Sequence, residues 1–202
     1  MGRVIYLTGA PATGKSTLCS ALKARNPNLV VLSYSSMLRA HIQSRTGVSL
    51  DAKGIRRRSS SVVTREDVKE VDELLVREVA VTRSTHDVIV DSHPVTKESF
   101  GFRVTPFNSQ KLLDFNPDAI ACLYADPEVL RQRICANPEG RPIPSVFELA
   151  IHVQTQCAVA AQYSMISGKS CYLLDTDDPV EVLAQRTAIT LKLEPDNTPR
   201  QR

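Results

Sequence analysis

The sequence predicts an α/β protein in which a parallel, five-stranded β-sheet carries helices on both faces. Five short runs rich in Val, Ile, Leu and Tyr are almost continuously apolar, as strands covered on both faces should be. Helical patterns separate these runs, and such alternation implies right-handed crossovers. A glycine-rich loop follows the first run and leads into a helix. Together these observations indicate a doubly wound, three-layer fold.

The predicted strands and helices alternate along the chain. Strands are expected at residues 3–7, 29–33, 88–91, 118–124 and 170–174. Helices are expected at residues 15–24, 36–44, 65–83, 127–136, 145–167 and 179–191. Thr64 and Asp67 form a capping-box-like start for the third helix, and Gly168 ends the fifth. We expect Tyr163 and Met165 to lie in the core and the segment 97–107 to be a long loop.

The length of the chain is most simply that of one domain, here residues 1–193, with two irregular insertions at 47–63 and 137–144. The polar tail 194–202 is expected to be disordered. Five scattered cysteines without a C-x-x-C pair suggest free, buried thiols in a reducing compartment. No apolar run approaches 18 residues, so we expect a cytoplasmic protein that does not enter a membrane.

The charge and aromatic content argue against a nucleic-acid surface. A formal net charge of +3 suits anionic ligands such as nucleotides but is too weak for a nucleic-acid footprint. Trp is absent and aromatic residues make up 5% of the chain, so few side chains are available to stack on single-stranded bases. The sequence therefore shows no specific nucleic-acid partner.

The stretch "GAPATGKST" fits the phosphate-loop pattern G-x-x-x-x-G-K-[ST] without a mismatch. Its glycines permit the turns that point successive N–H groups at a phosphate, and the following helix adds its positive N-terminal dipole. Lys15 supplies a charge to the β and γ oxygens, while the hydroxyl of Ser16 is a ligand for Mg²⁺. The predicted contacts to ATP in the loop are Gly9, Ala10, Pro11, Ala12, Thr13, Gly14, Lys15, Ser16 and Thr17.

A second buried strand ends in an acidic residue, as the metal site of a phosphate-loop protein requires. Asp91 follows Val88-Ile89-Val90 and is predicted to hold Mg²⁺ through water. The loop and this aspartate together predict binding of ATP with Mg²⁺.

The rest of the sequence narrows the class of nucleotide-dependent protein. No Asn-Lys-x-Asp-like motif for reading a guanine base is present, and a helicase or AAA+ protein would need more length and further motifs. A compact chain with two Arg-bearing insertions matches the layout of a small phosphoryl-transfer kinase.

Five segments resemble adenylate kinases in order and spacing, most closely the archaeal-type branch with its V-D-x-H third strand and short lid. They are "VIYLTGAPATGKSTL", "SSMLRAHI", "DVIVDSH", "FNPDAIACLYADPEVLRQRI" and "AAQYSMISGKSCYLLDTDDPVEVL". The resemblance covers about residues 3–190. It implies an acceptor-binding insertion at about 35–84, a lid at about 137–144, and a nucleoside monophosphate, most simply AMP, as acceptor.

The resemblance also implies roles for single residues. Arg39 matches the arginine on the acceptor phosphate, and Arg133 the arginine that packs on the donor nucleotide. Arg141 lies in the lid, which closes on the transferring group. The backbone at Asp175 borders the donor adenine. The acceptor side is completed by Ser36, Asp91, His93 and Arg103. These roles suit a loose phosphoryl transition state, which needs positioned positive charge more than a strong base.

One position departs from the family pattern. The long helix after the lid presents an arginine in adenylate kinases, whereas Gln156 or Cys157 occupies that place here. No Arg or Lys occurs from Pro142 to Gly168. Either Arg141 supplies the charge, or the run "RRR" at 56–58 does, or transfer is slow.

Two alternative functions therefore stay open. One is an ATPase switch that acts on a protein or ribonucleoprotein partner, as relatives of the archaeal-type branch do in ribosome assembly. The other is a kinase of a different small metabolite on the same scaffold.

Overall fold

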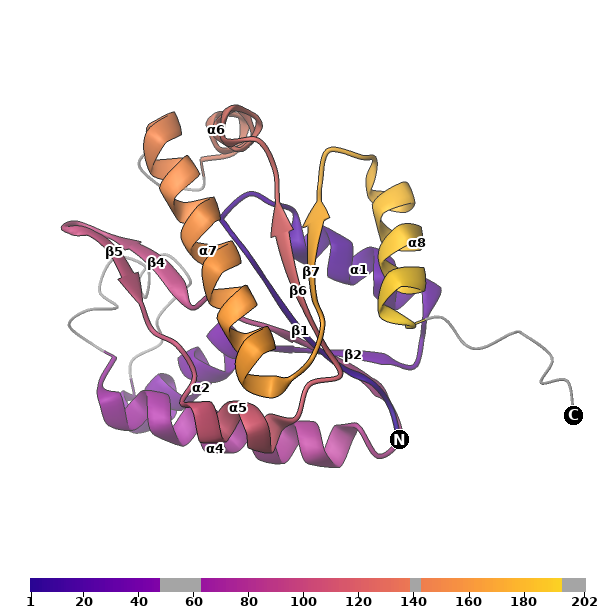
Figure 1. The fold of residues 1–202 in the computed structure, drawn as a ribbon. Helices are drawn as coiled ribbons and strands as arrows, with labels where there is room; N and C mark the ends of the chain where they lie inside the picture. The colour runs from indigo at the N-terminus through magenta and orange to yellow at the C-terminus, as the bar shows by residue number, and fades with distance from the viewer. Residues whose placement is uncertain (48–62, 139–142, 194–202) are drawn as a thin grey trace, which may run out of the picture.

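The computed structural model describes residues 1–47, 63–138 and 143–193. A five-stranded sheet has the order β2-β3-β1-β6-β7, and each neighbouring pair is parallel (Figure 1). The strands are β1 (Val4–Gly9), β2 (Leu29–Ser33), β3 (Asp87–Asp91), β6 (Ala119–Tyr124) and β7 (Cys171–Asp175). This arrangement confirms the predicted fold class.

Helices cover both faces of the sheet (Figure 1). On one face lie α1 (Lys15–Arg25) and α8 (Val180–Leu191). On the other lie α4 (Arg65–Thr82), α5 (Ser109–Phe115) and α7 (Val146–Ser167). Two further helices, α2 (Tyr34–Thr46) and α6 (Pro127–Ala136), follow the carboxyl ends of β2 and β6. Because helices cover both faces of the sheet, the sequences of its strands are almost continuously apolar.

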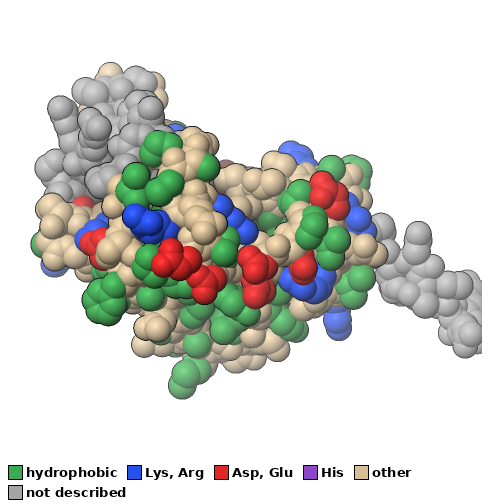
Figure 2. All heavy atoms as spheres, turned by 90° about the horizontal axis from the view of Figure 1, so that it is seen from above, with side chains coloured by type: hydrophobic (Ala, Val, Ile, Leu, Met, Phe, Trp, Pro, Cys, Tyr) green, Lys and Arg blue, Asp and Glu red, His purple; other side chains and the backbone are tan. Residues whose placement is uncertain are grey.

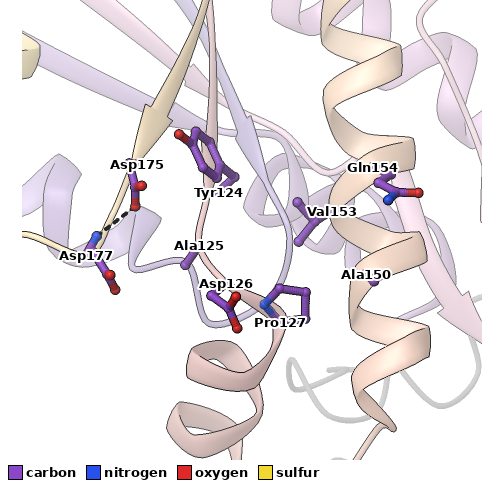
Figure 3. A pocket seen from close by; sticks show the side chains of 9 residues that line it. All are labelled: Tyr124, Ala125, Asp126, Pro127, Ala150, Val153, Gln154, Asp175 and Asp177. Carbon is purple, nitrogen blue, oxygen red and sulfur yellow. Dashed lines mark hydrogen bonds between the residues drawn. The ribbon is translucent and has the colours of Figure 1, made fainter.

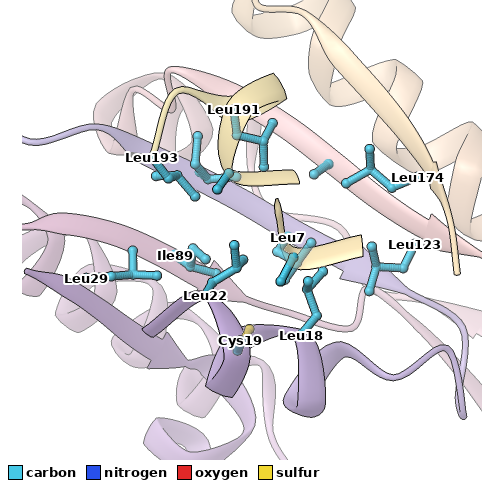
Figure 4. Packing of buried hydrophobic residues seen from close by; sticks show 14 of the residues in the cluster. Leu7, Leu18, Cys19, Leu22, Leu29, Ile89, Leu123, Leu174, Leu191 and Leu193 are labelled. Atoms are coloured by element: carbon cyan, nitrogen blue, oxygen red, sulfur yellow. The ribbon is translucent and has the colours of Figure 1, made fainter. Parts of the chain in front are cut away.

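Alternate side chains of the central strand β1 supply the two cores. Ile5 and Leu7 pack with α1 and α8, in the cluster that Figure 4 shows, whereas Val4 and Tyr6 point to the opposite face. Tyr6 makes edge-on contacts with aromatic rings there, and its ring centroid lies 5.2 Å from that of Tyr163. Both faces of β1 are therefore filled, which gives the phosphate loop a rigid base.

The predicted helix ends are confirmed at two places. The side chain of Thr64 accepts from the backbone N–H of Asp67, and the carboxylate of Asp67 accepts from the backbone N–H of Thr64, so α4 begins with a capping box. Gly168 ends α7 in the left-handed conformation at φ 65°.

The segment predicted as a long loop after β3 is an antiparallel hairpin of β4 (Val95–Glu98) and β5 (Gly101–Val104). The prediction was wrong because strands of four residues with polar side chains carry little hydrophobic pattern. Contact with α7 stabilises the hairpin: Val95 is buried, and the ring of Phe102 packs against that of His152 at 5.1 Å. The short helix α5 was also not predicted.

Two expectations about burial need correction. Met165 is 83% exposed, because it lies on the solvent side of α7, while Tyr163 is buried as predicted. All five cysteines are free thiols, but only Cys19 and Cys122 are buried; Cys135 is exposed on α6. Neighbouring apolar residues in the sequence therefore did not decide burial.

Among the described residues, no helix combines the length and apolar character needed to cross a bilayer.

Candidate nucleotide-binding site

The phosphate loop joins the carboxyl end of β1 to the start of α1. Gly9 cannot carry a side chain, because a Cβ there would lie 2.8 Å from the carbonyl oxygen of Leu123 on the neighbouring strand. Gly14, at φ 79°, is the left-handed residue from which α1 starts. Ala12 also has a positive φ, of 63°. The loop therefore holds the turned backbone that anion binding requires, directly before a helix N-terminus.

Lys15 lies inside this loop and is only 6% exposed. Its Nζ donates to the carbonyl of Gly9 at 3.2 Å, contacts Nδ1 of His93 at 3.1 Å, and lies 4.0 Å from Oδ1 of Asp91. Because the ammonium can only donate, Nδ1 of His93 acts as the acceptor. The loop thus holds a buried positive charge at the place where a phosphate would bind.

Asp91 ends β3 beside the loop, since the β1–β3 register pairs it with Leu7. Burial raises the pKa of its carboxyl, and the nearby charge of Lys15 opposes that rise. Its Oδ1 is buried and makes no hydrogen bond among the described residues. A carboxylate oxygen with no hydrogen bond in the described part of the chain, and the hydroxyl of Ser16 at the start of α1, are both hard oxygen ligands of the kind that Mg²⁺ takes. These residues therefore fit the predicted metal.

The residues predicted to bind the donor nucleotide, ATP, lie on the β6–β7 side of the loop. The guanidinium of Arg133 donates to the side chain and the backbone carbonyl of Thr176, at 3.1 and 2.8 Å, and reaches the carbonyl of Ala12 at 3.5 Å. Arg133 thus connects α6, the phosphate loop and the segment after β7. Asp175 is the last residue of β7, directly before this segment. The two predicted donor residues are therefore brought to one place.

The residues predicted to bind the phosphoryl acceptor lie on the β2–β3 side of the loop. Ser33 ends β2, and the register pairs it with Asp91. Arg39 on α2 donates to the hydroxyl of Ser36 at 2.8 Å, and Ser36 donates to that of Ser33 at 3.2 Å. The hydroxyl of Ser35 joins the same cluster at 3.2 Å from Ser33. The first turn of α2 contains no acidic residue.

This serine–arginine cluster, Ser33, Ser35, Ser36 and Arg39, has the chemistry of an anion site. Its hydroxyls and guanidinium are donors, it lies at a helix N-terminus, and its residues are partly or fully exposed to solvent. Sequence reasoning found Ser36 and Arg39 but missed Ser33 and Ser35. The run "SYSS" at the predicted strand–helix junction was the available signal.

Other predicted cations are placed differently. Arg103 on β5 pairs with Glu98 across the hairpin at 2.5 Å, and its guanidinium is thereby engaged within the hairpin. Arg141 and the run "RRR" at 56–58 lie outside the described residues.

Helix α7 brings no positive charge to the site, since it has no Arg or Lys along its length. Gln156 is 1% exposed, and its Nε2 donates to the hydroxyl of Thr8, which in turn donates to the carbonyl of Ser92. Cys157 contacts Cys122 on β6. Both residues that replace the expected arginine are therefore engaged with the sheet.

A pocket of about 380 Å³ lies between the ends of β6 and β7, the start of α6, and α7 (Figure 3). It is lined by Tyr124, Ala125, Asp126, Pro127, Ala150, Val153, Gln154, Asp175 and Asp177. Its lining includes three carboxylates, no cation and no residue of the phosphate loop, so it does not suit a phosphate. Figure 2 looks onto this end of the molecule and shows acidic side chains grouped between basic ones.

Comparison with known proteins defines the class. A protein-family model described as an AAA domain (AAA_17) matches residues 8–148. The chain belongs to this family.

A curated adenylate kinase from Pyrobaculum aerophilum is 24% identical over 152 residues, which are 74% of this chain and 73% of the relative. A sugar kinase from Janibacter sp. HTCC2649 shares the fold at a TM-score of 0.58, with 17% identity over 96% of this chain and 97% of its own. Shikimate kinase from Bacteroides thetaiotaomicron shares the fold at a TM-score of 0.56, with 19% identity over 94% of this chain and 98% of its own.

Gluconokinase from Sinorhizobium meliloti also has this fold, at a TM-score of 0.56 and 14% identity over 95% of this chain and 92% of its own. Family, phosphate loop and fold together identify a kinase-like phosphotransferase of the P-loop class.

Proposed function

We propose that this protein transfers the γ-phosphoryl group of ATP to a nucleoside monophosphate, with AMP as the acceptor. One observation supports this most: the serine–arginine cluster begins at Ser33, which lies beside Asp91, which in turn lies beside the phosphate-loop strand. An anion site thus lies on one side of the loop, and Arg133 lies on the other. The adenylate kinase among the relatives supports adenine as the acceptor base.

In the proposed reaction, the protein positions charge and excludes water. Lys15 and the backbone N–H groups of the loop hold the β- and γ-phosphates, while Arg133 holds the donor against Thr176. Arg39 and its serines hold the acceptor phosphate for in-line attack. Ser16 and Asp91 would hold Mg²⁺, which when bound would neutralise the charge that develops on the transferred group.

A steady-state assay of ADP release tests the proposal with AMP, GMP, CMP and UMP as acceptors. AMP should raise ADP release at least about tenfold over ATP alone. Arg39→Ala should raise the KM for AMP about tenfold or more and change kcat little, because a charge-assisted contact to the acceptor phosphate is lost. Arg25→Ala is the matched control, since this exposed arginine lies about 15 Å further along α1 from Lys15. An unchanged KM in Arg39→Ala would contradict the acceptor assignment.

A second candidate is a kinase whose acceptor is the hydroxyl of a small metabolite. It is favoured by α7, which supplies no cation to the bridging phosphates of a second nucleotide. An uncharged hydroxyl acceptor needs fewer cations. Adding gluconate, shikimate and hexoses to the acceptor panel separates the two, because stimulation by one of these and not by AMP supports the second candidate. Hydrolysis of ATP that responds to no acceptor supports an ATPase switch.

A further inference from the structure

Two thiols that are distant in the sequence meet between the sheet and α7. Cys122 lies on β6 and is fully buried, whereas Cys157 lies on α7 and is partly exposed. Their Sγ atoms are 3.8 Å apart. A third thiol, Cys171, begins β7 beside them and interacts electrostatically with both. The proposed phosphoryl transfer uses none of these residues.

The pair is electronically asymmetric. The hydrogen bond with Cys122 lowers the pKa of the Cys157 thiol below its ordinary value, although burial opposes this. The same bond, together with burial, raises the pKa of Cys122. The bond thus favours the thiolate form on Cys157 and the protonated form on Cys122. A nucleophilic thiolate next to a second thiol is the arrangement found at redox-sensitive sites.

We propose that Cys157 and Cys122 form a redox-active pair that is converted to a disulfide by peroxide. The thiolate of Cys157 attacks one oxygen of hydrogen peroxide, the O–O bond breaks, and the departing hydroxide is protonated to water. Cys157 is then a sulfenic acid. Cys122 loses its proton and attacks this sulfur, the S–O bond breaks, and a second water leaves. Two thiols are oxidised, one peroxide is reduced to two waters, and a dithiol reverses the change.

The pair lies close to the strand that carries the phosphate loop. A disulfide bond is about 2 Å long, so the two sulfurs must approach by nearly 2 Å. Cys157 follows Gln156, whose amide contacts Thr8, and the β1–β6 register pairs Thr8 with Cys122. Thr8 directly precedes Gly9. A disulfide here would therefore tie α7 to β6 beside the strand that carries the loop.

The covalent change is tested first, because its outcome does not depend on the proposed function. The full chain is treated with dilute hydrogen peroxide, quenched by acid, and analysed by intact mass and peptide mapping. We expect a loss of 2 Da, a fall from five titratable thiols to three, and a cross-link between the peptides that contain Cys122 and Cys157. Dithiothreitol should restore the mass.

Three variants make this test specific. Cys157→Ser should abolish the 2 Da loss, whereas Cys135→Ser, at the exposed cysteine of α6, should keep it. In Cys122→Ala, the sulfenic acid on Cys157 has lost its partner and should be trapped by dimedone. Circular dichroism checks that each variant is folded. A 2 Da loss that persists in Cys157→Ser, a cross-link to Cys171 instead, or oxidation of Cys135 alone would overturn the proposal.

Discussion

At the scale of single residues, the phosphate loop depends on Lys15, a buried charge with three identified contacts. The ammonium is held by a carbonyl, an imidazole nitrogen and a carboxylate. In water, such a charge would be screened, but at 6% exposure its field acts strongly on a phosphate. The residue is therefore central to any phosphoryl transfer here.

Lys15→Ala should lower turnover of ATP by roughly 10³-fold or more, because the charge on the β- and γ-oxygens is lost. Lys23→Ala is the control, since this exposed lysine lies two turns further along α1 and should leave turnover unchanged. Steady-state kinetics with thermal unfolding curves separates loss of catalysis from loss of folding. Residual activity within tenfold of the unmodified protein would contradict the assignment.

Gln156 is one of two residues at the place where the resemblance to adenylate kinases implies an arginine. Its Nε2 has a partner in Thr8, but its Oε1 is buried without a hydrogen bond among the described residues. A buried acceptor that lacks a donor costs free energy, so the amide is not optimal for stability.

Gln156→Met should change the free energy of unfolding by about 1 kcal/mol or less, because a similar volume is kept and the unpaired acceptor is removed. Gln156→Glu should destabilise the protein by roughly 3 kcal/mol, because a carboxylate is then buried without a cation. Urea denaturation at pH 7 measures both. Equal effects of the two substitutions would contradict this account of the site.

At the scale of elements, α4 carries two buried aspartates whose pKa values are shifted in opposite directions. Burial raises the pKa of Asp67, but hydrogen bonds from Thr64 and Arg45 outweigh it and lower the value to about 2. Burial raises the pKa of Asp72 to about 6, although the hydroxyl of Tyr34 donates to it. The ordinary value for both is 3.8. The two residues therefore respond to pH in opposite directions.

The stabilisation from Asp67 is complete above about pH 4 and is lost as the pH falls towards 2, because the unfolded state then binds the proton more tightly than the folded state. The difference in free energy of unfolding between the unmodified protein and Asp67→Asn should shrink over that range. Urea denaturation from pH 2 to 7 measures it.

Asp72 provides the matched comparison. Its folded pKa is raised, so its contribution is present below about pH 4 and is lost as the pH rises through 6. The unmodified protein should therefore lose stability relative to Asp72→Asn between pH 4 and 6. A parallel pH dependence of the two variants would contradict the assigned environments.

The predicted elements also show what local pattern can reveal. The long apolar strands and the amphipathic helix with Thr64 at its start were predicted, because continuous apolar runs and capping residues can be recognised within a short stretch of sequence. The hairpin at 95–104 was missed, since it is stabilised by contact with α7 rather than by its own pattern.

At the scale of the whole molecule, the order of the strands determines what meets at the site. Asp91 lies beside the loop because β3 pairs with β1, and Ser33 lies beside Asp91 because β2 pairs with β3. The donor residue Arg133 lies on the other side, next to the end of β7. Ligand binding across the carboxyl ends of several strands should therefore stabilise the whole fold.

ATP with Mg²⁺ should raise the midpoint of thermal unfolding, because a ligand that binds only the folded state stabilises it by about 2.7 kcal/mol at one hundred times its Kd. Chelation of the metal with EDTA should reduce the shift, and Lys15→Ala should remove most of it. Differential scanning fluorimetry measures all three. A full shift in Lys15→Ala would show that ATP binds elsewhere.

The sequence by itself determined the phosphate loop, the buried strands and the class of chemistry, because each depends on residue types at short, regular spacing. Tertiary structure alone decided that Arg103 pairs within its hairpin, that Gln156 contacts Thr8, and that Cys157 meets Cys122. These contacts join residues up to 148 positions apart. The contacts of Gln156 and Cys157 follow from strand order and helix packing, which no local pattern encodes, whereas Arg103 and Glu98 are five positions apart and meet because the hairpin forms.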